Sequence, residues 1–202
     1  MVHRLLVSNL FITVGLEEGT QEWREWRHKG IGASDAPVIM GESRLKNVAE
    51  LLEEKCGPAL DFGRNDRSIR GSDLEPDARR RYMAKTGKQV IAACIQSSRY
   101  DWLRASVDGL SLTHDSVVEI SCGSSIYWRT AKSLRVPPYC FGQLQHILAV
   151  TGFESVDFWC CSPGCNDLLL RVERDDVYIE RLLELEGEFW KHVAMRRSLV
   201  AN

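Results

Sequence analysis

The stretches Leu103-Arg104-Ala105-Ser106-Val107-Asp108-Gly109 and Val117-Val118-Glu119-Ile120-Ser121 decide the fold that this sequence predicts. Their apolar side chains predict strands over 103–106 and 117–121, and the second run is apolar enough to be a central strand. Asp108 follows the first strand at a predicted turn, whereas Glu119 interrupts the apolar run of the second. Burying a carboxylate in a central strand is costly. We therefore expect these two acids to have a function.

Further strands and helices extend outward from this pair. Residues 89–95 predict another strand, and the turn Ser162-Pro163-Gly164 joins strands over 155–161 and 168–173 into a hairpin. The polar stretch 59–69 predicts a loop. Caps and helical spacing predict helices over 20–29, 34–41, 47–56, 72–87, 139–150 and 175–197. The expected fold is a single α/β domain over residues 1–202, with a central sheet flanked by helices.

The helix predicted before the sheet begins at Ser72 or Asp73, with Pro76 in its first turn. A proline is tolerated there because the first N–H groups of a helix have no partner inside the helix. Its predicted apolar stripe contains Leu74, Ala78 and Tyr82.

Composition excludes several classes of protein. The chain has 202 residues, of which 44% are apolar and 27% are charged, which is typical of a globular domain and not of a disordered one. No apolar run approaches the roughly 20 residues that span a bilayer. Residues 1–14 lack a cleavage site for a secretory signal. Seven cysteines without regular spacing favour a reducing compartment, so we expect a cytoplasmic protein without a membrane partner.

Charge is distributed unevenly along the chain. The net charge is −2, but eight Lys or Arg stand against four acids between Arg64 and Lys88. Such a basic segment could hold a nucleic-acid backbone. Charge alone, however, favours a solvated helix face.

Four polar residues occupy positions where burial would be costly: Asp108, Glu119, Glu75 on the preceding helix and Gln143 on the helix over 139–150. Carboxylates from neighbouring strands and a helix form an oxygen cage, which suits Mg²⁺ or Mn²⁺. The alternative is that Glu119 points outward from an edge strand and Asp108 only caps a turn. Spacing alone does not decide between the two.

The order of several motifs resembles the lambda exonuclease (YqaJ-type viral recombinase, or alkaline exonuclease) family of PD-(D/E)XK nucleases. The similarity extends from about Gly19 to Gly152. Its blocks are Gly19-Thr20-Gln21-Glu22-Trp23 with Arg27, Ile31-Gly32-Ala33-Ser34-Asp35, Arg70-Gly71-Ser72-Asp73-Leu74-Glu75-Pro76 with Ala78-Arg79, Ala105-Ser106-Val107-Asp108-Gly109, Val118-Glu119-Ile120-Ser121-Cys122, and Val136-Pro137-Pro138-Tyr139 leading to Gln143-Leu144-Gln145. The resemblance implies a restriction-endonuclease-like core with a central mixed β-sheet.

The resemblance also implies roles at the cleavage centre. Asp108 and Glu119 would bind the metal, Mg²⁺ with Mn²⁺ as a substitute. Glu75 would support the metal site, Gln143 would orient water or phosphate, and Ser121 would occupy the position of a catalytic lysine.

A second set of matching positions would hold the terminal 5′-phosphate of the strand being digested: Arg27, Ser34 and Ser106, with Arg129 as a further candidate. A guanidinium and two hydroxyls suit a phosphate dianion, because it needs charge-assisted donors in a fixed geometry.

Two residues depart from the family pattern. Val107 replaces a proline, which changes backbone stiffness. Ser121 replaces the lysine of Glu-x-Lys, and a hydroxyl donates one hydrogen bond but carries no charge. Lys132 or Arg129 could take over the lysine's role, the enzyme could rely on metal-bound water at alkaline pH, or the chain could bind DNA ends without cutting them.

The family resemblance implies a 5′-to-3′ exonuclease on double-stranded DNA ends, which leaves a 3′ single strand for recombination by single-strand annealing. It further implies a ring-shaped homotrimer and a single-strand annealing protein as partner. The alternative is a weakened or inactive DNA-end-binding protein of the same fold, because of Ser121.

Overall fold

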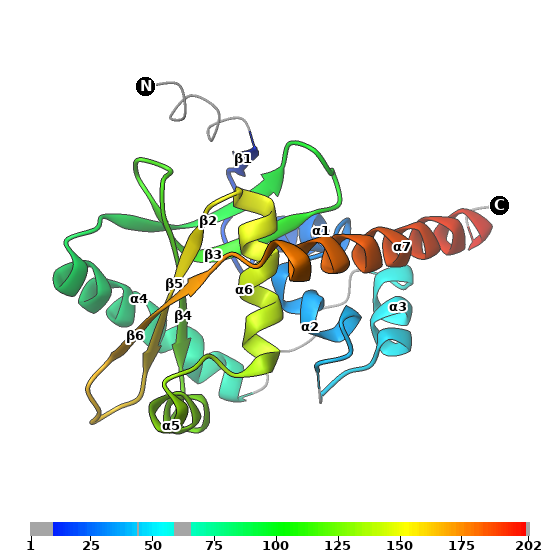
Figure 1. Ribbon diagram of the computed structural model, residues 1–202. Helices are drawn as coiled ribbons and strands as arrows, with labels where there is room; N and C mark the ends of the chain where they lie inside the picture. The colour runs from blue at the N-terminus through cyan, green and yellow to red at the C-terminus, as the bar shows by residue number, and fades with distance from the viewer. Residues whose placement is uncertain (1–9, 44, 59–65, 201–202) are drawn as a thin grey trace.

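The computed structural model describes residues 10–43, 45–58 and 66–200 (Figure 1). The strands are β1 (Phe11–Val14), β2 (Val90–Ser97), β3 (Arg104–Ser111), β4 (Val117–Cys122), β5 (Ser155–Cys161) and β6 (Leu168–Glu173). The helices are α1 (Gln21–His28), α2 (Ala36–Ile39), α3 (Val48–Cys56), α4 (Asp66–Thr86), α5 (Ser124–Ser133), α6 (Pro138–Thr151) and α7 (Asp176–Val200), and a 3₁₀ turn over Ala33–Asp35 precedes α2.

The strands form one mixed sheet in the order β1-β2-β3-β4-β5-β6. Every neighbouring pair is antiparallel except β4 and β5, which are parallel. Parallel strands need a crossover connection, which α5 and α6 supply here. The predicted α/β fold with a central mixed sheet is confirmed.

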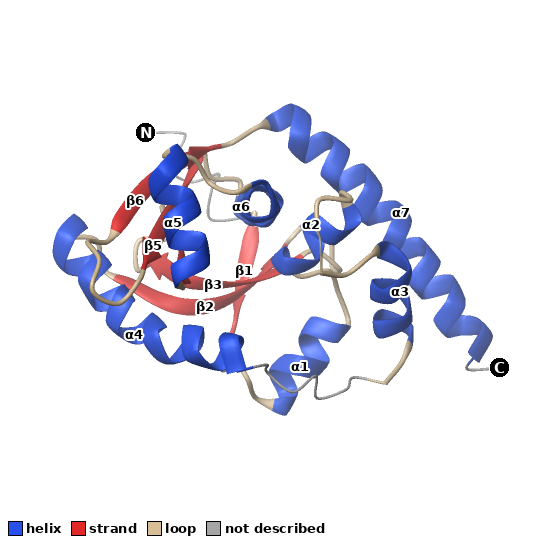
Figure 2. Ribbon diagram, turned by 90° about the horizontal axis from the view of Figure 1, so that it is seen from below, coloured by secondary structure: helices blue, strands red, loops and turns tan. Residues whose placement is uncertain are grey.

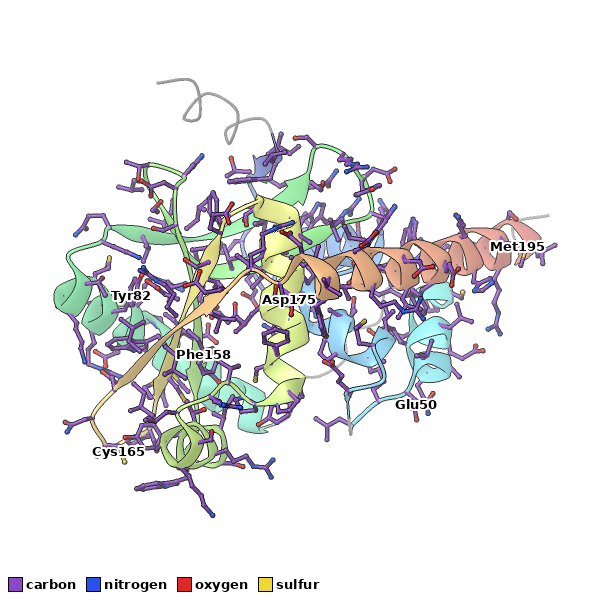
Figure 3. The ribbon with its side chains drawn as sticks, viewed as in Figure 1. Glu50, Tyr82, Phe158, Cys165, Asp175 and Met195 are labelled. Carbon is purple, nitrogen blue, oxygen red and sulfur yellow. The ribbon has the colours of Figure 1, made fainter. Side chains whose placement is uncertain are left out.

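Helices cover both faces of the sheet. Figure 2 shows α4 on one side and α5 and α6 on the other. Successive strand residues point to opposite faces, so Phe158 of β5 packs on the α6 side, while Trp159 packs with Tyr82 of α4. Tyr82 and Phe158 are labelled on their elements in Figure 3. A third cluster joins α2, α3 and α7 through Val38, Leu51 and Phe189.

Local sequence signals set several element boundaries as predicted. Thr20 caps α1, because its hydroxyl accepts the N–H of Trp23. Asn47 and Glu50 form a reciprocal capping box at the start of α3. The predicted hairpin is also present, since β5 and β6 pair antiparallel from Ser155–Glu173 onward.

The start of α4 was predicted wrongly. The helix begins at Asp66, so the end of the predicted 59–69 loop is helical, and residues 59–65 lie outside the described residues. Pro76 consequently lies inside the helix and not in its first turn. Ala78 and Tyr82 are buried against the sheet as predicted, but Leu74 is 37% exposed. Ala78 and Tyr82 fix the later turns against the sheet, and the helix extends beyond the predicted cap towards Asp66.

Two elements were not predicted. β1 is a four-residue strand paired with β2, from Phe11 opposite Ser97 to Val14 opposite Cys94. It is too short for its apolar pattern to indicate a strand. α5 follows β4 after Gly123.

All seven cysteines are free thiols. Among the described residues, none of the helices combines the length and apolarity needed to cross a membrane.

Candidate functional site

The predicted metal ligands meet where β3 and β4 separate. Cα pairing between these strands covers Gly109 opposite Val118 and Leu110 opposite Val117. At the residue of β3 that precedes Gly109, the Asp108 carboxylate accepts a hydrogen bond of 2.6 Å from the backbone N–H of Ile120. Asp108 therefore lies inside β3, not at a turn after a strand as predicted, because β3 continues to Ser111.

The close approach of the two strands beside Asp108 requires a glycine at position 109. A Cβ there would lie 2.6 Å from Val118 Cγ1 and 2.8 Å from Val90 Cγ2. Both neighbours are β-branched and therefore stiff. Gly109 thus lets the sheet close directly next to the Asp108 side chain.

Glu119 lies on β4 and points to the α6 side of the sheet. Its Oε1 accepts a hydrogen bond of 2.5 Å from Gln143 Nε2 of α6. Its Oε2 is buried without a hydrogen-bond partner. The structure therefore contradicts the alternative that Glu119 points outward from an edge strand.

The carboxylates of the site act on one another. Burial, together with the charge of Glu75, raises the pKa of Asp108 to about 8. Burial and the charges of Asp108 and Glu75 also raise the pKa of Glu119. A fourth acid, Glu18, raises the pKa of both Asp108 and Glu119 further. The site concentrates negative charge that a proton or a cation must balance.

These residues fit a hard divalent cation. The donors are carboxylate oxygens, and Glu119 Oε2 is a buried acceptor with no partner. Within the described residues, no group of three or more His, Cys, Asp or Glu side chains is arranged so that it could hold a metal by itself. The protein would thus supply Asp108 and Glu119 and leave other positions to water or substrate, as Mg²⁺ prefers.

The predicted phosphate ligands lie beside these acids. A cavity of about 180 Å³ is lined by both predicted sets, namely Asp108, Glu119, Glu75, Gln143, Arg27, Ser34 and Ser106. A larger hollow of about 670 Å³, between the α5–α6 connection and β6, contains none of them. The small cavity therefore joins a carboxylate centre to a cationic corner.

The cationic corner is held in place by hydrogen bonds and stacking. The Arg27 guanidinium donates to the Ser34 hydroxyl and lies 5.2 Å from the centre of the Trp23 ring. Trp23 in turn donates its indole N–H to Ser106 Oγ at 2.8 Å. Arg27, Ser34 and Ser106 therefore belong to one connected arrangement of donors.

A buried ion pair supports the segment that carries Ser34. Lys55 Nζ lies 2.7 Å from Asp35 Oδ2, and both side chains are almost fully buried. Burial alone would raise the pKa of Asp35. The charges of Lys55 and Arg27, with hydrogen bonds from Lys55 and Gly32, overcome this effect and lower it to about 2.

We expect this pair to make folding acid-sensitive. Because the pKa of Asp35 is lower in the folded chain than its ordinary 3.8, the pair stabilises the fold above pH 4, and this contribution is lost as the pH falls towards 2. It amounts to about 2 kcal/mol. Asp35→Asn should therefore have a lower free energy of unfolding than wild type at pH 7. This difference in the free energy of unfolding should narrow by about 2 kcal/mol near pH 2.

Denaturant unfolding at pH 7, 4 and 2.5 measures that gap. The control is Asp176→Asn, which removes a carboxylate that is 80% exposed. A gap of constant size for Asp35→Asn across the series would contradict the prediction.

Three predicted residues do not line the cavity. Ser121 lies on β4 two residues beyond Glu119, so the two side chains share a face of the sheet. Arg129 and Lys132 are exposed on α5. The structure therefore brings two predicted groups together and leaves the position of the missing lysine outside the cavity lining.

Sequence reasoning did not identify Glu18 and Arg79 as residues of the site. Glu18 lines the cavity from the segment before α1, where no local pattern distinguishes it from its acidic neighbour. Arg79 of α4 donates from Nε to the backbone carbonyl of Asp108, and its charge lowers the pKa of that carboxyl against the larger effect of burial. Arg79 had been noted only as part of a motif.

Known proteins share both the sequence pattern and the fold. The sequence model of the YqaJ-like viral recombinase domain family matches residues 22–154. The uncharacterized protein YqaJ of Bacillus subtilis (strain 168) is 28% identical over 179 residues, which are 86% of this chain and 56% of that protein. The chain thus spans about half the length of that curated relative.

Solved structures extend the comparison. The alkaline exonuclease LHK-Exo of Laribacter hongkongensis superimposes with a TM-score of 0.80 at 25% identity, covering 90% of this chain and 96% of that one. The same exonuclease in complex with dAMP gives a TM-score of 0.78 at 26% identity, again covering 90% and 96%. A phage-related exonuclease of Haemophilus somnus 129PT shares the fold, with a TM-score of 0.63, 11% identity and coverage of 89% and 98%.

Proposed function

Because the chain belongs to the YqaJ-like viral recombinase domain family, we propose that it is a metal-dependent exonuclease that digests double-stranded DNA from its ends. One observation carries this proposal: the acidic pair Asp108 and Glu119 and the donors Arg27, Ser34 and Ser106 line the same cavity. The structural similarity to an alkaline exonuclease supports a nuclease of this kind.

A divalent cation held by Asp108 and Glu119 would act as a Lewis acid and neutralise charge on the phosphodiester being hydrolysed. Gln143 holds Glu119 through Oε1, while Oε2 has no hydrogen-bond partner. The Ile120 N–H fixes Asp108 in the same way. Both carboxylates are thus positioned before substrate arrives, which lowers the reorganisation needed during the reaction.

The cationic corner formed by Arg27, Ser34 and Ser106 would restrict cleavage to the ends of DNA strands. A terminal phosphate dianion matches a guanidinium flanked by hydroxyls, and only a strand end offers such a group. Filling the corner with a 5′-phosphate would give 5′-to-3′ digestion and leave a 3′ single strand. LHK-Exo has been crystallised with dAMP, a deoxynucleoside monophosphate and therefore the class of product that a DNA exonuclease releases.

The assembly is proposed on family resemblance. We propose a homotrimer that works in the cytoplasm with a single-strand annealing protein, so that the 3′ strand enters recombination. Mg²⁺ is the proposed cofactor, and Mn²⁺ should replace it.

Digestion of linear and covalently closed circular duplex, with Mg²⁺ or with EDTA and from pH 7 to 10, tests the activity. We expect digestion of linear duplex only in the presence of the metal, at a rate that increases with pH. The covalently closed circular duplex should remain intact. Cleavage of the circle would contradict an end-dependent mechanism.

Ser121 favours a second candidate function, a DNA-end-binding protein with little or no cleavage, because its hydroxyl supplies no positive charge on the face of β4 that carries Glu119. Binding of duplex ends without hydrolysis at any pH would support it.

Replacing Ser121 by the lysine of the family pattern distinguishes the exonuclease from the DNA-end-binding protein. We expect Ser121→Lys to raise the digestion rate about tenfold or more, because a positioned cation stabilises developing negative charge. Val177→Lys, which adds the same charge at an exposed position of α7, is the control. An unchanged rate in Ser121→Lys would show that this position does not limit the reaction.

A further inference from the structure

A long part of the chain after the acidic centre contains no acids. Residues 120–153 include no Asp or Glu, although they carry Arg129, Lys132 and Arg135. These three cations are exposed, and none of them forms an ion pair among the residues that the structure describes. Their charge is therefore available to a partner.

These cations lie on α5 or directly after it, and the helix also carries an exposed tryptophan. Trp128, Arg129 and Lys132 are spaced as neighbours on one side of α5, and Arg135 follows the end of the helix. Trp128 is 62% exposed. It meets Tyr127 edge to face at 5.3 Å between ring centres, and Tyr127 is anchored by a hydrogen bond from its hydroxyl to the Asn166 carbonyl. We call Trp128, Arg129, Lys132 and Arg135 the α5 face.

The α5 face belongs to the helix that directly follows the strand carrying Glu119. β4, which carries Glu119, ends at Cys122, and α5 begins at Ser124. At the start of α6, burial and Cys140 raise the pKa of Tyr139, and the Arg129 charge opposes this rise. Burial and then the Glu119 charge raise the pKa of the neighbouring Cys140 to about 12. Figure 2 shows α5 beside α6 on the same side of the sheet.

We propose that the α5 face binds single-stranded DNA, the strand that digestion leaves behind. Its cations would contact phosphates, and Trp128 would stack on an unpaired base. A duplex hides its base faces within the stack, so an exposed indole matches a single strand better. If two copies of the chain met through their α5 faces, the like charges would repel each other. This inference rests on the proposed function, because it assigns the path of that reaction's remaining strand.

Binding without cleavage tests the proposal. Fluorescence anisotropy of labelled oligo(dT) of 20 nucleotides in EDTA measures affinity while no hydrolysis occurs. We expect Trp128→Ala to weaken binding about 5- to 150-fold, the range for loss of one stacked base, and Trp128→Tyr to retain much of it. Arg135→Gln should lower the slope of log K against log salt concentration by about 0.7.

The matched control is Lys191→Gln, which removes an exposed cation from α7 and should leave the slope unchanged. Equal affinity of Trp128→Ala and wild type would overturn the proposal. If the affinity is unchanged and light scattering shows that Trp128→Ala has an altered mass, the α5 face is a subunit interface instead.

The two functional proposals can fail separately. A wild-type protein that digests duplex but does not bind oligo(dT) would overturn only the role of the α5 face. A protein that binds oligo(dT) through Trp128 but digests nothing, at any pH with Mg²⁺ or Mn²⁺, would overturn only the exonuclease.

Discussion

Asp108→Asn is expected to digest linear duplex about 10³-fold or more slowly than wild type, because it removes a charge that would hold the cation. The asparagine keeps the shape of the side chain and an oxygen that can accept the N–H of Ile120. The loss should therefore arise at the reacting centre and not through unfolding.

Stability measurements separate these causes. Asp108 lies among acids that raise its pKa, so its neutral replacement should not lower the melting temperature of the metal-free protein. Mn²⁺ should raise the melting temperature of wild type, as any ligand of the folded state does, but not that of Asp108→Asn. Glu180→Gln, at an exposed position of α7, is the control. Undiminished digestion by Asp108→Asn would remove Asp108 from the mechanism.

The second large effect concerns the end of the substrate. We expect wild type to digest 5′-phosphorylated duplex about 10²–10³-fold faster than 5′-hydroxyl duplex at low substrate concentration, because the terminal phosphate forms several charge-assisted hydrogen bonds. Arg27→Gln should reduce this preference to near one. Arg27→Lys should retain part of it, since lysine keeps the charge but not the fork of donors.

The preference is a ratio within each variant, so partial loss of folded protein cancels from it. That matters because Arg27 also stacks on Trp23 and lowers the pKa of Asp35. Lys29→Gln, at the end of the same helix, should keep the full preference. Equal rates of wild type on the two substrates would contradict a 5′-phosphate site in this cavity.

Local sequence signals succeeded where one short segment decides the outcome. Thr20 and Asn47 cap helices with their own side chains, and the apolar run around Glu119 forms a central strand as predicted. The same signals failed for α4, whose start at Asp66 depends on more than a cap at Ser72 or Asp73. β1 forms because β2 offers it an edge, and its four residues carry too little pattern to show this in advance.

His146 shows that the spacing of residues within one helix does not reveal a buried contact between two helices. The structure buries His146 completely. Its Nε2 donates to the Arg104 carbonyl at 2.8 Å, and its Nδ1 lies 2.7 Å from Glu186 Oε1 of α7. Glu186 is likewise completely buried, on α7. Such a pair depends on two elements meeting, and spacing within one of them does not reveal it.

The sequence by itself determined the α/β class, the order of most elements and the residues of the two predicted groups, because strand alternation, caps and motif order are written within short segments. Only the tertiary structure decided that both groups line one cavity, that Asp108 takes the Ile120 N–H where β3 and β4 part, and that Glu18 joins them. Ser121 remains outside that lining. The physical reason is that a cavity forms between elements far apart in the chain, so its walls are fixed by sheet order and helix packing, which no single segment encodes.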